Sequence, residues 1–163
     1  MFPSDVLESA ARVVARLRAA RLKVTTAESC TGGLIAGAIT SIAGSSSVLD
    51  QGFVTYANSA KTEMIGVDAG LIREHGAVSA EVGRAMADGA LKTAAADVAV
   101  AVTGIAGPGG GTLEKPVGLV FIGLASRTAS TSVERFDFGD IGRENVRIAT
   151  VREALKLLER AAE

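Results

Sequence analysis

The chain has 163 residues, of which 48% are hydrophobic and 21% are charged. This length suits one domain, residues 1–163, with a sizeable buried core. Seventeen basic and eighteen acidic residues give a formal net charge of −1. The sequence has no run of Lys and Arg, so its charge disfavours a nucleic-acid-binding protein.

Targeting and redox signals are also lacking. No window approaches the roughly 18 consecutive apolar residues of a membrane span, and Met1–Asp5 does not begin a signal peptide. We therefore expect a cytoplasmic protein without a membrane partner. The only cysteine, Cys30, excludes an internal disulfide and a cysteine metal cluster. We expect no metal, because no dense His/Asp/Glu cluster is present, and no cofactor.

Helices and strands alternate along the first half of the chain. Ser4 and Asp5 are expected to cap a first helix, whose apolar residues recur with the spacing of one helical face. These apolar residues are Val6, Ala10, Val13, Val14 and Leu17. The next predicted elements are a strand at Leu22–Thr26, a helix at Thr31–Ala43, a polar loop at 44–47, a strand at Gln51–Tyr56, and a helix capped by Asn58 or Ser59 and stopped by Gly66.

The second half continues this alternation and ends in a hairpin and a helix. The predicted elements are a helical turn at Leu71–His75, a helix from its cap Ser79 to Ala95, a buried strand at Val98–Val102, an antiparallel pair of strands at Val117–Ala125 and Ser132–Phe138, and a last helix after Gly142. The pattern predicts a three-layer α/β/α sandwich with a mixed, mostly parallel sheet of about five strands.

Polar or glycine-rich clusters follow three of the predicted strands. They occupy residues 28–30, 56–61 and 103–112. Ligands of open α/β sheets bind beyond the carboxyl ends of the strands, so the three clusters meet at one edge if these strands are parallel. This convergence predicts a ligand-binding or catalytic site at that edge.

Ser29 lies at a strand-to-helix turn, where a nucleophile would be presented. Gly32 and Gly33 would let a substrate approach the backbone closely, and the free N–H groups of the helix start would attract an oxyanion. A helix cap is the alternative role for Ser29. Cys30 is a rival nucleophile because a thiol near a helix start gains thiolate character, but we interpret it as a buried packing residue.

Lys61 is the candidate base for Ser29, because the only histidine, His75, lies in a turn that gives no support for a triad. A lysine enclosed by protein can lose its proton and accept one from a nucleophile. Tyr56 would relay that proton or hold the amine. A solvated Lys61 and a Tyr56 buried at a strand end are the alternatives. Glu28 would compensate the helix dipole, or orient Lys61 or the substrate.

The glycine-rich segment 103–112 holds five glycines and one proline, which regular structure does not accommodate. Its N–H groups would cradle a phosphate, or the segment would form the wall of a nucleotide pocket. It matches neither a P-loop nor the dinucleotide-binding fingerprint. A mobile surface loop is the alternative, but the position after the central strand favours function.

Four segments together resemble the CinA carboxy-terminal domain family. They are Glu28-Ser29-Cys30-Thr31-Gly32-Gly33, Tyr56-Ala57-Asn58-Ser59-Ala60-Lys61, Thr103-Gly104-Ile105-Ala106-Gly107-Pro108-Gly109-Gly110 and Lys115-Pro116-Val117-Gly118. The resemblance covers essentially the whole chain. The family contains nicotinamide mononucleotide deamidases of the PncC type, and several members carry a further amino-terminal domain resembling molybdopterin-binding proteins, so this chain looks like the stand-alone form.

The resemblance implies hydrolysis of the carboxamide of nicotinamide mononucleotide, a step of pyridine nucleotide salvage and NAD metabolism. It implies Ser29 as nucleophile, Lys61 as general base and Tyr56 as the partner of that base. The implied substrate-binding residues are Glu28, Thr31, Gly32, Gly33, Asn58, Thr103, Gly104, Gly107, Pro108 and Gly109. The implied fold is similar to an anticodon-binding-like α/β/α sandwich with a mixed sheet. The expected partner is a small-molecule nucleotide, and a homo-oligomer is compatible with the family.

Two other functions stay open at this point. One is a non-catalytic nucleotide-binding or regulatory module, and the other is an amidase or esterase for another small substrate. The substrate phosphate would bind the glycine-rich segment or arginines such as Arg143 and Arg147. Both arginines would otherwise be solvated helix residues.

Overall fold

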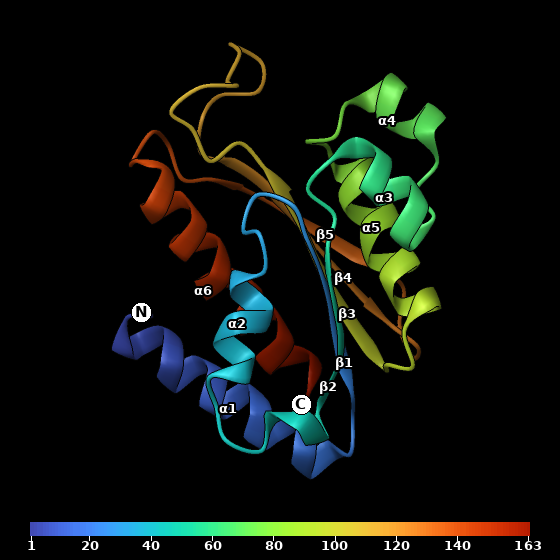
Figure 1. Ribbon diagram of the computed structural model, residues 1–163, viewed down its shortest axis with the longest axis vertical. Helices are drawn as coiled ribbons and strands as arrows, with labels where there is room; N and C mark the ends of the chain where they lie inside the picture. Colours follow the sequence, from blue (N-terminus) through green and yellow to red (C-terminus); the bar gives the residue numbers. More distant parts are fainter.

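The computed structural model describes residues 1–163 as one five-stranded sheet with helices on both faces (Figure 1). The strands are β1 (Val24–Glu28), β2 (Leu49–Val54), β3 (Val98–Gly104), β4 (Leu119–Ser126) and β5 (Ser132–Asp137). The helices are α1 (Ser4–Ala20), α2 (Leu34–Thr40), α3 (Asn58–Ile65), α4 (Ala69–His75), α5 (Ala80–Thr93) and α6 (Arg143–Ala161), with a 3-10 turn at Ser45–Ser47. The predicted α/β/α sandwich is confirmed.

The strand order is β2-β1-β3-β4-β5. β1 pairs in parallel with β2 and β3, whereas β4 pairs antiparallel with β3 and β5. Only β4 therefore runs against the other four strands, and the sheet is mixed and mostly parallel, as predicted. Glu28, the last residue of β1, is level with Val54 on β2 and Val102 on β3. The segments that follow these three strands leave the sheet at the same edge.

The sheet separates two cores. Along β3, Val98 and Val100 belong to the core under α1, α2 and α6, while Ala99 and Ala101 belong to the core under α3, α4 and α5. This alternation follows from the two-residue period of a strand. Because β3 is covered on both faces, every residue is apolar up to Val102. No helix is both long and apolar enough to span a bilayer.

The predicted caps of two helices, α1 and α3, are wrong. α1 follows Pro3 and α3 follows Ala57, and neither helix has a side-chain cap. Asp5 lies inside α1 and instead accepts hydrogen bonds from Arg152 on α6. The predicted caps that fail are Ser4, Asp5, Asn58 and Ser59. By contrast, Ser79 caps α5 as predicted, since its hydroxyl accepts from the N–H of Val82.

Gly89 lets α5 pass directly under the end of α3. A Cβ at this position would overlap the carbonyl oxygen of Ile65, the last residue of α3. α3 also carries Lys61, so this close approach sets the position of Lys61 relative to the sheet.

Replacing Gly89 by alanine should lower the free energy of unfolding by about 2 kcal/mol, because displacing α3 outweighs the roughly 1 kcal/mol that alanine gains in a helix. Gly37→Ala is the matched control, because Gly37 also lies inside a helix and the nearest atom to its Cβ would be 3.5 Å away, on Phe2. The control should be neutral or stabilising. Urea unfolding measures both, and equal stability of the two variants would contradict the packing argument.

Candidate active site

Ser29 directly follows the last residue of β1. Its N–H donates to the carbonyl of Val102 at 3.1 Å, which extends the pairing with β3 by one residue. Alternation along the strand places Ser29 on the same face as Ala27, the face that α3, α4 and α5 cover. Ser29 is half-buried and therefore reachable from solvent.

Lys61 reaches Ser29 from α3. Its Nζ lies 3.2 Å from Ser29 Oγ, 2.9 Å from the carbonyl oxygen of Thr55 and 3.4 Å from that of Tyr56. Only 1% of its surface is exposed, so Lys61 is not the solvated lysine of the alternative interpretation. No carboxylate pairs with it. Burial therefore lowers the pKa of Lys61, because the ammonium form loses its hydration.

This geometry suits a neutral amine that acts as a base. A neutral amine has two N–H bonds and one lone pair. The two N–H bonds match the carbonyls of Thr55 and Tyr56, which leaves the lone pair for the hydroxyl proton of Ser29. Lys61 can thus accept the Ser29 proton without moving. The structure brings together the two residues predicted as nucleophile and base.

Glu28 caps α2 from inside the protein. Its side chain is fully buried and accepts hydrogen bonds from Thr31 Oγ1 at 2.6 Å and from the N–H groups of Gly33, Ile35 and Ala36 at 3.1, 3.0 and 2.9 Å. A carboxylate at a helix start satisfies both the free N–H groups and the dipole. Among the predicted roles, dipole compensation fits this geometry.

The predicted substrate contacts of Glu28 and Thr31 need correction. Both side chains have no exposed surface and bond to each other inside the turn. They therefore support the nucleophile turn, residues 29–33, rather than touch a substrate. Gly32 is exposed and Gly33 is half-buried, so both remain candidates for close approach of a ligand.

Fewer N–H groups are available to an oxyanion than the sequence predicts. Glu28 already occupies N–H groups at the start of α2, the groups expected to face the oxyanion. Within the nucleophile turn, the N–H of Ser29 donates to Val102 and that of Gly32 donates to Ser29. The N–H groups of Cys30 and Thr31 have no acceptor in the protein. Thr31 has no exposed surface and Cys30 is 6% exposed, so of the two only Cys30 has surface that a ligand can reach.

Cys30 packs in the core between the sheet and α1, α2 and α6. Burial raises the pKa of its thiol to about 12. At neutral pH the residue is therefore a thiol and a poor nucleophile. This supports its interpretation as a packing residue.

The hydroxyl of Tyr56 turns away from Lys61. The side chain is 59% exposed, and the hydroxyl accepts a hydrogen bond from Arg143 Nη2 at 3.1 Å. Arg143 Nη1 also donates to the carbonyl of Gly107 at 2.9 Å, which links α6 to the glycine-rich segment. A proton relay through the hydroxyl is therefore not what the structure shows; Tyr56 holds the amine through its main-chain carbonyl.

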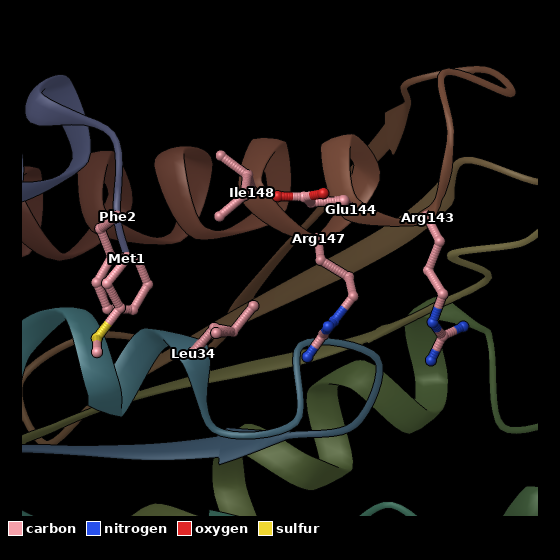
Figure 2. Close-up of a pocket in the computed structure, with 7 residues that line it drawn as sticks. All are labelled: Met1, Phe2, Leu34, Arg143, Glu144, Arg147 and Ile148. Atoms are coloured by element: carbon pink, nitrogen blue, oxygen red, sulfur yellow. The ribbon is translucent and has the colours of Figure 1, made fainter.

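Arg147 binds the nucleophile turn from the side of α6. Its Nε donates to the carbonyl of Cys30 at 3.1 Å and its Nη2 to that of Thr31 at 2.9 Å. Figure 2 shows Arg143 and Arg147 extending from α6 towards the loops. Beside them is a cavity of about 390 Å³, which does not include Ser29 or Lys61. It is lined by Met1, Phe2, Leu34, Arg143, Glu144, Arg147 and Ile148.

The glycine-rich segment is fixed at its base and exposed at its end. Thr103 is buried and its hydroxyl donates to the carbonyl of Ala77 at 2.7 Å, so its predicted substrate contact is also corrected to a supporting role. At Gly104 a Cβ would collide with Val120, so the close approach of β4 explains why a glycine stands here. Its predicted contact with the substrate stays a prediction. Gly107 is buried, and its carbonyl is bound by Arg143.

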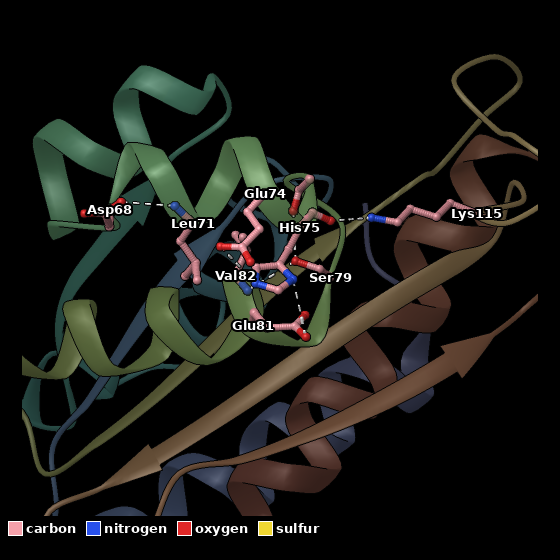
Figure 3. A network of polar contacts seen from close by, with 9 residues as sticks. Asp68, Leu71, Glu74, His75, Ser79, Glu81, Val82 and Lys115 are labelled. Atoms are coloured by element: carbon pink, nitrogen blue, oxygen red, sulfur yellow. Dashed lines mark hydrogen bonds and ion pairs between the residues drawn. The ribbon is translucent and has the colours of Figure 1, made fainter.

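Other predicted binding residues lie on the surface. Pro108, Gly109 and Asn58 are exposed and free to contact a ligand. Lys115, further along the segment, donates from Nζ to the carbonyl of His75 at 2.6 Å and ties the segment to the end of α4 (Figure 3).

His75 takes no part in the Ser29 site. Its ring lies 3.6 Å from Glu81 and 3.8 Å from Glu74 (Figure 3). This agrees with the lack of support for a Ser-His-Asp triad in the sequence. No group of three or more His, Cys, Asp or Glu side chains is placed to hold a metal ion.

Sequence reasoning missed Thr55. Its carbonyl is the nearest acceptor of Lys61, and its own buried hydroxyl has no hydrogen-bond partner. The only available signal was its position between β2 and the polar segment 56–61. Every residue type has a main-chain carbonyl, so the side chain at position 55 does not indicate this contact.

The comparisons with known proteins agree with this fold. The sequence profile of the CinA C-terminal domain matches residues 7–162. A CinA-like protein of Geobacter sp. (strain M21) is 54% identical over 160 residues, covering 98% of this chain and 38% of its own length. A putative competence-damage inducible protein of Caldicellulosiruptor bescii is 47% identical over 149 residues, with coverages of 91% and 36%. The chain thus spans under two fifths of the length of these relatives.

Solved structures cover the chain almost completely. The competence/damage inducible protein CihA from Agrobacterium tumefaciens is 52% identical, with a TM-score of 0.98 over 100% of this chain and 99% of that one. A competence-damaged protein (CinA) superfamily protein from Klebsiella pneumoniae is 35% identical, with a TM-score of 0.91 over 96% and 97%.

The lowered pKa of Lys61 makes stability depend on pH. Between this pKa and the ordinary value of 10.5, the unfolded chain binds a proton that the folded protein does not, so stability rises with pH in that window. Relative to Lys61→Met, the wild-type protein should gain up to about 1.4 kcal/mol per pH unit there. Urea unfolding at a series of pH values measures this. Lys92→Met, at an exposed lysine of α5, is the control that should keep the wild-type slope. A parallel pH dependence of wild type and Lys61→Met would refute the shift.

The raised pKa of Cys30 should protect its thiol from alkylation. In the folded protein at mildly alkaline pH, iodoacetamide should modify Cys30 at least about 100 times more slowly than in urea, because both burial and the scarcity of thiolate oppose reaction. Mass spectrometry counts the modified fraction. Rapid modification of the folded protein would show an accessible thiolate and restore Cys30 as a rival nucleophile.

Proposed function

This chain belongs to the CinA C-terminal domain family, and on that basis we propose that it hydrolyses the carboxamide of nicotinamide mononucleotide to nicotinic acid mononucleotide and ammonia. The proposal is carried by one observation, the 3.2 Å contact between Ser29 Oγ and a buried Lys61 without a carboxylate partner. The names of the relatives refer to competence and damage, so the reaction rests on the site chemistry and on the resemblance of the motifs.

The first step is attack of Ser29 on the carboxamide carbon. Neutral Lys61 takes the hydroxyl proton as the new C–O bond forms, while the carbonyls of Thr55 and Tyr56 keep the amine in place. The negative charge moves to the carboxamide oxygen. The N–H of Cys30, which has no acceptor in the protein, is the donor for this oxyanion, and loss of one such donor typically costs about 10²–10³ in rate.

The second step releases ammonia. The C–N bond breaks as the ammonium group of Lys61 returns its proton to the departing nitrogen, which leaves an ester on Ser29 and a neutral amine. Water then gives a proton to Lys61 as its oxygen attacks the ester carbon. The bond between that carbon and Ser29 Oγ breaks as Lys61 returns the proton to Oγ, which releases the carboxylic acid and restores Ser29 and the neutral amine. Lys61 contacts Ser29 directly, so neither proton transfer needs the hydroxyl of Tyr56.

A positively charged side chain that could bind the phosphate of the nucleotide lies near the site. Arg143 is exposed and held between the hydroxyl of Tyr56 and the carbonyl of Gly107. A fixed guanidinium suits a phosphate because it offers paired donors. The exposed Pro108 and Gly109 border the same segment. We assign phosphate binding to Arg143.

Ammonia release from nicotinamide mononucleotide tests this function. Wild type should release one ammonia per nicotinic acid mononucleotide formed, and Ser29→Ala and Lys61→Met should each lose at least about 10³-fold in kcat. Lys92→Met and Cys30→Ala should keep most of the activity. No release by wild type, or full activity in both site variants, would overturn the proposal; binding without turnover would favour a nucleotide-binding module.

A further inference from the structure

A cavity between α2, α6 and the start of the chain contains neither Ser29 nor Lys61. Its volume of about 390 Å³ lies within the range of about 300–1,000 Å³ that is usual for small-molecule pockets. We call it the α2–α6 cavity. The lining residues that bear on its chemistry are Phe2, Leu34, Arg143, Glu144, Arg147 and Ile148.

One part of the lining is apolar. Phe2, Leu34 and Ile148 come from three separate segments, and each is half-buried against the core under α1, α2 and α6. Figure 2 shows Leu34 on α2 opposite Ile148 on α6, with Phe2 at one end and Arg147 at the other. The ring of Phe2 lies over Gly37, where a Cβ would be 3.5 Å from it. A flat apolar ring placed among these side chains would remove their remaining apolar surface from water.

The other part of the lining is positively charged. The side chains of Arg143 and Arg147 donate only to a hydroxyl and to main-chain carbonyls, so no carboxylate neutralises either guanidinium. Arg143 is also the first residue of α6, which has no side-chain cap, so the positive end of the helix dipole lies here. The one acidic residue of the lining is Glu144. A single anionic group suits this balance, whereas a polyanion would meet the carboxylate of Glu144.

Arg147 contacts both the α2–α6 cavity and the nucleophile turn. Its Nε and Nη2 donate to the carbonyls of Cys30 and Thr31, which holds the guanidinium in one position. These bonds use two of the five N–H bonds of a guanidinium, and Nη1 donates to no group of the protein. A fixed guanidinium with free N–H bonds can bind a carboxylate at little cost in side-chain order.

We propose that the α2–α6 cavity is a second ligand site, for a small organic anion that has one flat apolar ring system and a single carboxylate. The ring lies among Phe2, Leu34 and Ile148, and the carboxylate accepts from Arg147. This inference does not rest on the proposed hydrolysis, because the cavity contains neither Ser29 nor Lys61.

NMR titration of the full chain with 1-naphthoate tests the proposal. The methyl resonances of Leu34 and Ile148 should shift saturably, with a Kd on the order of 1 mM or below, as expected for a ligand of this size. The Nε–H resonance of Arg147 should shift with them, because the carboxylate binds the same guanidinium. Two further probes separate ring from charge: 1-naphthamide has the ring without the charge, and acetate has the charge without the ring. Each should bind at least about 10 times more weakly than 1-naphthoate.

Ile148→Glu and Ile141→Glu are a matched pair of variants. The first places a carboxylate in the apolar part of the cavity, and it should weaken 1-naphthoate binding at least about 10-fold, followed at the Leu34 methyls. The second makes the same change at a residue that is 47% exposed and does not line the cavity, so it should bind like wild type. Urea unfolding checks that both variants are folded, and the three probes test the same chemistry on the unchanged chain.

Leu71 reports adventitious binding to apolar surface. It lines a larger cavity of about 600 Å³, whose charged residues are Asp68, Asp88 and Lys92, so 1-naphthoate should leave its methyl resonances in place. Equal shifts at Leu71 and Leu34, equal binding of 1-naphthamide, or no saturable shift up to about 10 mM would overturn the proposal.

Ser29→Ala separates the two proposals of function. This variant should bind 1-naphthoate like wild type, because Ser29 does not line the cavity. Loss of binding in Ser29→Ala would show that the cavity belongs to the Ser29 site and would overturn the second site, while the hydrolase proposal would stand. Failure of wild type to release ammonia would overturn the hydrolysis alone and would leave the α2–α6 site standing.

Discussion

The site depends on one unusual burial, that of the Lys61 amine without a carboxylate partner. A buried charge without a partner is costly, so burial favours the neutral amine. Two main-chain carbonyls then satisfy its N–H bonds and direct its lone pair to Ser29. The fold supplies this placement, because the parallel strands β1 and β2 end level with each other and Gly89 lets α5 support α3.

A second constraint acts on the turn that carries Ser29. The start of a helix commonly binds an anion. At the start of α2 the buried carboxylate of Glu28 already accepts the hydrogen bonds that such an anion would accept. The helix dipole thereby holds the turn and does not face a substrate. Only the N–H groups of Cys30 and Thr31 are left without acceptors, on a turn that Arg147 fixes from outside. Catalytic donors in this account come from the turn and not from the helix.

The layers, the strand directions and the meeting of Ser29 with Lys61 were predictable, because the two-residue period, the buried run of β3 and the polar strand ends encode them. The boundaries of the strands were less predictable. β1 lies at Val24–Glu28, two residues later than predicted, because Glu28 still pairs with β3. The directions of Glu28 and of the Tyr56 hydroxyl were not predictable. They depend on Ala36 and Arg143, whose positions follow only from packing.

The ionisation of Lys61 is the most direct test of the account. The ¹⁵N resonance of its Nζ, followed by NMR against pH in the folded wild-type protein, reports the proton on that atom. Because burial lowers the pKa of Lys61, the midpoint should lie below the ordinary 10.5. A midpoint at or above 10.5 would show a charged amine and would contradict its role as the base for Ser29.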